Sequence, residues 1–216
     1  MSGPLVVVGA GPGVGAAVAR RYAREGHPVG LIARTAQRLD ALAGALRRHG
    51  RPAAAAVADV RDPAAVRRAL DELTAELGPP VALCVSPLPD VATIKPVAET
   101  TAEDLQAALA LGVVGTAAAV GHVLPAMRAA GHGTLLFTTG SAVLRPNAAR
   151  AASGIVNAAQ ATYFRMLHDS LAGAGIHVLH TVIVGPIGDG GHDPDAIADA
   201  MWRAAAARTE VRIVIE

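Results

Sequence analysis

Apolar residues alternate along the chain between short continuous runs and longer segments with helical spacing. The short runs are rich in Val, Ile, Leu and Ala, which is typical of buried strands. They cover residues 5–8, 29–33, 54–57, 81–85, 134–138, 177–184 and 211–215. Between them, apolar residues recur at three- and four-residue steps, as Leu39, Leu42 and Leu46 do, and predict amphipathic helices. These helices cover residues 16–25, 36–48, 63–77, about 101–130, about 151–172 and 194–207.

Strands that alternate with helices to the end of the chain predict parallel βαβ units. The expected fold class is therefore α/β, with a single doubly wound parallel sheet and helices on both faces. No fixed-period repeat and no linker divides the pattern, so we expect residues 1–216 to form a single domain.

Composition narrows the classes of partner. Hydrophobic residues make up 52% of the chain and charged residues 17%, a balance that excludes disorder for most of it. The formal net charge of +1 and the 2% of aromatic residues favour neither nucleic acid nor an anionic membrane as a partner. Because Cys84 is the single cysteine and the histidines show no H-x-x-x-H pairing, we expect no disulfide and no metal site.

Two segments bear on membranes and targeting. Residues 105–127 carry no charge and are long enough to span a bilayer, but Ala and Gly dominate them, so we expect a buried helix that is hydrophobic all round. The start, Met1-Ser2-Gly3-Pro4, lacks the basic region of a signal peptide. We therefore expect a cytoplasmic protein.

The first predicted strand ends in a cluster of glycines, Gly9, Gly11, Gly13 and Gly15, before a helix opens. Glycine lets the backbone turn tightly and approach a pyrophosphate, which rests at the helix N-terminus. The spacing departs from G-x-G-x-x-G, because Val14 stands where the last glycine belongs, and no Gly-Lys-Ser/Thr of a P-loop follows. We expect nucleotide binding here, the alternative being a plain glycine-rich turn.

With this turn, the sequence resembles the short-chain dehydrogenase/reductase family, whose motif is G-x-x-x-G-x-G, over nearly the whole chain. Asp59-Val60 resembles the family's pair at the adenine ring, and Gly175-Ile176-His177-Val178 resembles its Gly-Ile-Arg-Val. Val184-Gly185-Pro186-Ile187 stands where the family has Pro-Gly-x-h, whose last residue meets the nicotinamide carboxamide. The resemblance implies a Rossmann-like dinucleotide-binding fold with these residues at the cofactor: Gly9, Gly11, Gly13, Val14, Gly15, Asp59, Val60 and Ile187.

Arg34 directs the cofactor prediction to NADP(H). It follows the second strand, where an acidic residue would bond the ribose 2′-hydroxyl of NAD, and no Asp or Glu lies between Gly30 and Gln37. A guanidinium forms forked, charge-assisted bonds with phosphate, which suits the 2′-phosphate of NADP, and Arg38 is placed to assist. The alternative is a solvated surface arginine.

The catalytic positions depart from the family. Its proton chemistry uses Ser, Tyr and Lys, with an Asn that holds a water relay. Ser141 matches the serine, but the Tyr-x-x-x-Lys positions fall on Ser153 and Asn157 when counted back from Gly175, or on Gly154 and Ala158 when counted forward from Ser141. Gly112 takes the place of the asparagine. We therefore name Ser141, Ser153 and Asn157 as candidate catalytic residues, without a group that titrates near neutral pH.

Other residues are candidates to replace the missing Tyr and Lys. Tyr163 lies on the same helix as Ser153, but about 280° around it, and suits packing or a subunit interface better. Loop residues at the carboxyl ends of the strands are better placed, although each is also typical of a solvated loop: Asp90, Lys95, Asp189, His192 and Asp193. His122 and His132 are interpreted as structural. The loop from Gly188 to Asp193 is short, which implies an open pocket or one completed by another subunit.

Three functions stay open. The first is an NADP(H)-dependent oxidoreductase with a rebuilt site that acts on a small organic carbonyl, enone or imine. The second is a repurposed enzyme for cyclisation, dehydration or isomerisation, and the third is a non-catalytic NADP(H)-binding or sensing subunit. In each case we expect a homodimer or homotetramer formed through the uncharged helix and the helix at 151–172.

Overall fold

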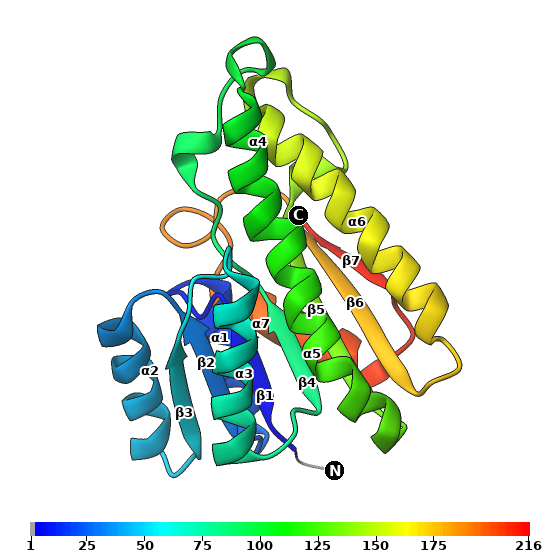
Figure 1. Ribbon diagram of the computed structural model, residues 1–216. Helices are drawn as coiled ribbons and strands as arrows, with labels where there is room; N and C mark the ends of the chain where they lie inside the picture. Colours follow the sequence, from blue (N-terminus) through cyan, green and yellow to red (C-terminus); the bar gives the residue numbers. More distant parts are fainter. Residues whose placement is uncertain (1–2) are drawn as a thin grey trace.

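The computed structural model describes residues 3–216. Met1 and Ser2, part of the start in which no signal-peptide region was found, lie outside the described residues. The described chain forms one seven-stranded sheet in the order β3-β2-β1-β4-β5-β6-β7, with every pairing parallel (Figure 1). The strands are β1 Leu5–Val8, β2 Val29–Ala33, β3 Ala53–Val57, β4 Ala82–Val85, β5 Gly133–Gly140, β6 Ile176–Ile183 and β7 Arg212–Ile215. This confirms the predicted doubly wound α/β class.

Helices cover both faces of the sheet because side chains alternate along each strand. Leu5 and Val7 of β1 pack against α1, α2 and α7, whereas Val6 and Val8 pack against α3, α5 and α6. The helices are α1 Val14–Arg24, α2 Ala36–Arg48, α3 Pro63–Leu77, α4 Ala102–Leu109, α5 Gly115–Ala130, α6 Ala151–Leu171 and α7 Pro194–Ala207. The sheet therefore separates two apolar cores.

Several helix boundaries follow from local capping chemistry. Asp62 accepts hydrogen bonds from the amides of Ala64 and Ala65, and Pro63 is the first residue of α3. Asp193 caps α7 in the same way, with proline next along the chain. Thr101 and Asp104 form a reciprocal capping box that starts α4.

The long uncharged helix differs from its prediction. It is α4, a five-residue π-helical segment at Ala110–Val114, and then α5, rather than one regular helix. By length and composition alone Ala102–Ala130 could cross a membrane, yet 33% of its most apolar stretch is buried inside this chain. Within this chain the helix is therefore only partly buried, and the rest of its expected burial depends on the predicted assembly.

The chain runs from β1 outward to β3 on one side and from β4 outward to β7 on the other, so the strand order reverses between β1 and β4. In open α/β sheets such a switch point leaves a crevice at the carboxyl ends of the strands, where ligands bind. The turn after β1, the turn after β4 and the loops after β5 and β6 meet at this edge.

Candidate functional site

The glycines of the turn from β1 to α1 are of two kinds. At some of them neighbouring atoms leave no space for a side chain, and at others the space beside the backbone is empty. Gly9 has a φ of 87°, and a Cβ there would lie 2.6 Å from backbone atoms of Pro87. A Cβ on Gly15 would lie 2.5 Å from the carbonyl oxygen of Gly9. In contrast, a Cβ on Gly13 would meet no atom within 4 Å. The turn is thus tightly seated on β4 and open at Gly13.

The N-terminus of α1 lies in that open space. Gly13 is its N-cap residue, no side chain caps it, and Val14 is its first helical residue. The amide of Gly11 donates a hydrogen bond to the Gly9 carbonyl oxygen over 2.7 Å, which holds Gly11 in the turn. The first N–H groups of a helix have no intrahelical acceptor, so this end favours an anion.

Charged side chains gather beyond β2 and β3. Arg34 is exposed directly after β2, and no hydrogen bond or ion pair engages its side chain among residues 3–216. Its positive charge helps to lower the pKa of Asp59, although the hydrogen bond from Arg61 is the larger cause. Arg61 grips Asp59 with both Nε and Nη2, the shortest contact being 2.6 Å. The Asp59 carboxylate is thus already engaged. Sequence reasoning missed Arg61.

Val60 is buried and has a packing role besides its predicted one. A Cβ on Gly115 would lie 2.1 Å from the Val60 carbonyl oxygen, so α5 approaches this segment at a glycine. This contact fixes the loop after β3 against α5.

The candidate catalytic residues converge from β5 and α6. Ser141 opens a short 3-10 turn directly after β5 and is partly buried. Asn157 donates from Nδ2 to the carbonyl oxygen of Gly140 over 3.3 Å, which brings α6 against the residue before Ser141. Ser153 lies one turn earlier on the same helix face as Asn157. The structure thus places Asn157 against the residue before Ser141, and the assignment of Ser153 and Asn157 to the Tyr-x-x-x-Lys positions stays a prediction.

A buried histidine lies behind this point. His180 Nε2 and Thr139 Oγ1 are 2.7 Å apart, and Thr139 is two residues before Ser141. Burial lowers the pKa of His180 to about 4, so the ring is neutral near neutral pH. This pair could not be predicted, because a histidine inside an apolar strand has no motif around it.

Gly112 and Gln160 form a contact that the sequence did not indicate. The Gln160 carboxamide donates to the Gly112 carbonyl oxygen over 3.0 Å, and Thr116 Oγ1 donates to the same oxygen over 2.6 Å. A Cβ on Gly112 would lie 2.4 Å from Val156 Cγ1. The place of the family's asparagine therefore has no room for a side chain, and α6 satisfies the carbonyl that the π-helical segment frees.

Four of the five loop candidates have structural partners, namely Asp90, Lys95, His192 and Asp193. Lys95 is paired with Asp104 at 2.9 Å, and its carbonyl accepts the Ala151 amide at the start of α6. Asp90 accepts the Ala92 amide, and Asp193 caps α7. His192 Nε2 lies 2.7 Å from the Val184 carbonyl oxygen, and its backbone bonds Gly188 and Pro186, which closes the short loop that carries Ile187. Burial raises the pKa of Tyr163, a half-buried residue packed on the α6 core.

Comparisons with known proteins agree with this geometry. The family model of short chain dehydrogenases matches residues 4–188. No curated protein matches the chain. Among solved structures, a short-chain dehydrogenase from Rhodopseudomonas palustris is 24% identical with a TM-score of 0.88, covering 99% of this chain and 98% of that one.

Two further structures are described as NADPH complexes. An L-sorbose reductase from Gluconobacter frateurii, complexed with NADPH and L-sorbose, is 20% identical with a TM-score of 0.89, covering 100% of this chain and 96% of that one. An NADPH-bound short chain oxidoreductase from Pseudomonas aeruginosa PAO1, described as containing an atypical catalytic center, is 21% identical with a TM-score of 0.90, covering 99% and 95%.

The fold and the glycine turn define a dinucleotide-binding α/β protein. The chain belongs to the short-chain dehydrogenase family. Its residues fit a dinucleotide, because the open space at Gly13 and the uncapped start of α1 leave room for a pyrophosphate at the switch point. Among residues 3–216, no group of three or more His, Cys, Asp or Glu side chains is placed to hold a metal ion.

Proposed function

We propose that the protein is an NADP(H)-dependent oxidoreductase of a small organic carbonyl, enone or imine, with a non-standard catalytic site. The observation that carries the proposal is the pairing of the open, uncapped helix start at Gly13 with the unengaged guanidinium of Arg34. The first suits the pyrophosphate and the second suits a 2′-phosphate. The two NADPH-bound structures of the same fold support the choice.

The bound cofactor would supply or accept a hydride at its nicotinamide ring. Ser141 is placed after β5 to donate a hydrogen bond to a substrate oxygen or nitrogen. Asn157 holds the Gly140 carbonyl and so fixes the backbone on which Ser141 stands. None of Ser141, Ser153 and Asn157 titrates near neutral pH, so they orient a substrate rather than exchange its proton.

The lack of a titrating side chain restricts the substrate. General acid–base catalysis typically contributes about 10²–10⁴-fold to a rate. A polarised enone or an iminium needs little proton assistance and retains most of the rate that positioning gives. Simple ketones and aldehydes should be reduced slowly or not at all.

The test is NADPH consumption with a panel of ketones, enones and imines. We expect turnover with enones or imines, and a decrease of about 10-fold or more in Ser141→Ala, because that variant loses the orienting hydrogen bond. Ser170→Ala, at the other end of α6, is the matched control and should keep its rate. Fast turnover of simple ketones that survives in Ser141→Ala would contradict the proposal.

A second candidate function also follows from the lack of a side chain that titrates near neutral pH. If the panel is silent while NADPH binds tightly, the pocket serves non-redox chemistry such as cyclisation, dehydration or isomerisation, or a cofactor-sensing subunit without catalysis. Lys95, Asp104 and His192 already have partners within the fold, so none of them is free to replace the missing lysine and tyrosine. This favours a non-redox or a sensing function.

A further inference from the structure

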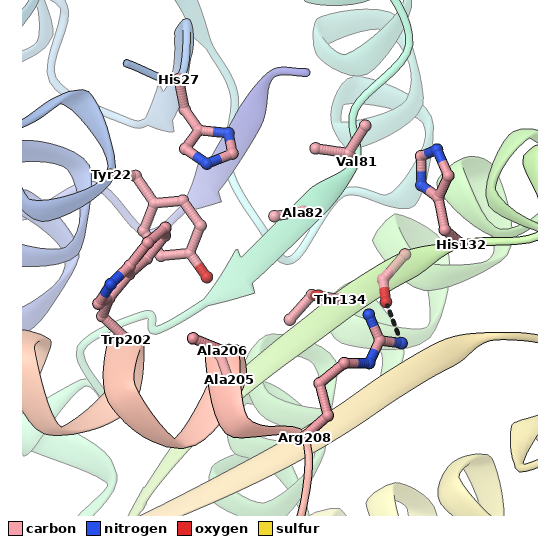
Figure 2. A pocket seen from close by; sticks show the side chains of 11 residues that line it. Tyr22, His27, Val81, Ala82, His132, Thr134, Trp202, Ala205, Ala206 and Arg208 are labelled. Atoms are coloured by element: carbon pink, nitrogen blue, oxygen red, sulfur yellow. Dashed lines mark hydrogen bonds between the residues drawn. The ribbon is translucent and has the colours of Figure 1, made fainter. Parts of the chain in front are cut away.

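A cavity of about 280 Å³ lies at the amino ends of β4 and β5, between α1 and α7 (Figure 2). It is remote from the glycine turn, because Gly13 precedes the first turn of α1 and Tyr22 lies in the last. Its volume is close to the lower limit of about 300 Å³ for small-molecule pockets. One ring-sized molecule matches that space.

Aromatic rings form one wall of this cavity. Tyr22 and Trp202 meet edge to face with their centroids 4.7 Å apart, and His27 lies 5.3 Å from Tyr22 and 5.7 Å from Trp202. His27 is itself fixed, since its Nδ1 lies 2.7 Å from the Gly3 carbonyl oxygen. A planar apolar body would pack against this wall.

Ion pairs between α1 and α7 hold the wall in place. Arg20 lies 2.8 Å from Asp195, and Arg21 lies 2.7 Å from Asp199. These ion pairs link the two helices that carry the rings, and both helices pack into the same apolar core.

The Tyr22 hydroxyl offers a hydrogen-bond donor to a ligand in the cavity. Tyr22 is 4% exposed, and no hydrogen bond engages its hydroxyl among residues 3–216. Figure 2 shows the hydroxyl directed into the space bordered by Ala82, Thr134 and Ala206. The buried side-chain atoms without a partner among residues 3–216 are His177 Nε2 and Thr181 Oγ1, so the Tyr22 hydroxyl is open to the cavity and within reach of an acceptor on a ligand there.

The charged side chain at the cavity is a cation. Arg208 lines it, together with His27 and His132, and no carboxylate of the described residues does. Arg208 uses only Nη2 for its bonds to the carbonyl oxygens of Gly133 and Gly175, so Nε and Nη1 keep their N–H groups. The lining therefore favours a negative charge on the ligand.

We propose that this cavity is a second small-molecule site, which binds a planar organic carboxylate. The carboxylate accepts a hydrogen bond from the Tyr22 hydroxyl and is attracted by Arg208, while the apolar body rests against Tyr22 and Trp202. The site does not depend on the function proposed for the opposite edge of the sheet.

Trp202 allows a direct test, because it is the single tryptophan of the chain and lines the cavity. The probe is benzoate, and benzyl alcohol is its uncharged counterpart. We expect a saturable change of Trp202 fluorescence with benzoate at millimolar concentration and a much weaker one with benzyl alcohol. Tyr22→Phe, which keeps the ring, and Arg208→Lys, which keeps the charge but changes the donor geometry, should each weaken benzoate about 5-fold or more.

Arg203→Ala is the matched control, because Arg203 is exposed on α7 outside the lining. It should bind benzoate as the wild type does. NADPH affinity, measured by calorimetry, should stay unchanged in all three variants, which separates this site from the cofactor site. No saturable fluorescence change, equal binding of the uncharged alcohol, or unchanged benzoate affinity in Tyr22→Phe would overturn the proposal.

Discussion

At the scale of one residue, we expect Arg34 to decide the cofactor preference. Its guanidinium is exposed at the end of β2 and unengaged among the described residues, beside the Asp59–Arg61 pair. Losing a forked contact with a phosphate lowers affinity about 10–100-fold. We expect Arg34→Ala to weaken NADPH by that factor and NADH hardly at all, as measured by calorimetry.

Arg48→Ala is a suitable control for this measurement. Arg48 is also exposed, but it lies at the far end of α2. It should leave both affinities unchanged. Equal affinity of the wild-type protein for NADPH and NADH would remove the assignment to NADP(H).

His180 makes stability depend on pH. Its folded pKa is lowered to about 4 by burial, from the ordinary value of 6.5. Between these values the unfolded chain binds more protons, so stability falls as the pH drops through 6.5 toward 4. From about pH 7 to about pH 5 we expect His180 to account for a loss of about 2 kcal/mol.

Urea unfolding at the two pH values measures this effect. His180→Gln can keep a hydrogen bond to Thr139 but does not titrate, so its loss should be smaller. Burial also lowers the pKa of His177, which leaves part of the dependence in place. The exposed His49→Gln should behave like the wild type. A loss in His180→Gln as large as in the wild type would argue against the lowered pKa.

Individual residues were predictable from the sequence only where a motif names them. Gly9, Gly13 and Gly15 have the spacing of a dinucleotide-binding turn, and Arg34 lies directly after a strand. Arg61 and Gln160 were missed, because their roles depend on partners brought close by folding: Asp59 in one case and the Gly112 carbonyl in the other.

The π-helical segment between α4 and α5 is the element on which the site's shape depends. Gly112 lies against Val156 of α6, and an added Cβ would be 2.4 Å from Val156 Cγ1. Valine is stiff in a helix, so it cannot swing aside. We expect Gly112→Ala to lower the free energy of unfolding by about 1–3 kcal/mol, as measured in urea.

Two companion variants separate the packing clash from helix propensity. Gly121→Ala, on α5 with no atom within 4 Å of the added Cβ, should be neutral or stabilising. Adding Val156→Ala to Gly112→Ala removes the opposing methyl groups and should make the two substitutions strongly non-additive. Additive effects of the pair would show that the close approach does not govern stability here.

Element boundaries were predictable where caps mark them. The predicted limits of the helices at 36–48, 63–77 and 194–207 are those of α2, α3 and α7, and Asp62 and Asp193 cap the last two. The π-helical segment carries no such mark. Residues Ala110–Val114 are as apolar as their neighbours, and the extra backbone residue is stabilised by Gln160 from another helix.

At the scale of the whole molecule, the strand and helix alternation was enough to predict the sheet, because parallel crossovers allow few arrangements. The uncharged helix predicted an apolar surface that needs cover, but not how much of that cover this chain supplies. An uncharged sequence indicates burial without saying whether the covering surface belongs to the same chain. The 33% burial of the stretch within Ala102–Ala130 shows that this chain covers one side of it only.

The uncovered side predicts self-association. Val114, Ile155 and Met166 are 47%, 44% and 63% exposed, and α6 packs beside α4 and the π-helical segment, so their apolar surfaces adjoin. Large exposed apolar patches typically mark protein–protein contacts. We expect a homodimer or homotetramer formed through α4, α5 and α6, with a mass in light scattering that is a multiple of 21.7 kDa.

A charge placed on this surface tests which face is involved. Met166→Glu should shift the protein toward monomer, because a carboxylate buried at an interface loses its hydration without a partner. Leu88→Glu, on the 84% exposed side chain of the loop after β4, should leave the mass unchanged. A wild-type mass of 21.7 kDa at micromolar concentration would refute the association, and an unchanged mass in Met166→Glu would place the interface elsewhere. Since α6 also carries Ser153 and Asn157, loss of the assembly should loosen the contact of Asn157 with Gly140 and lower NADPH turnover together with the mass.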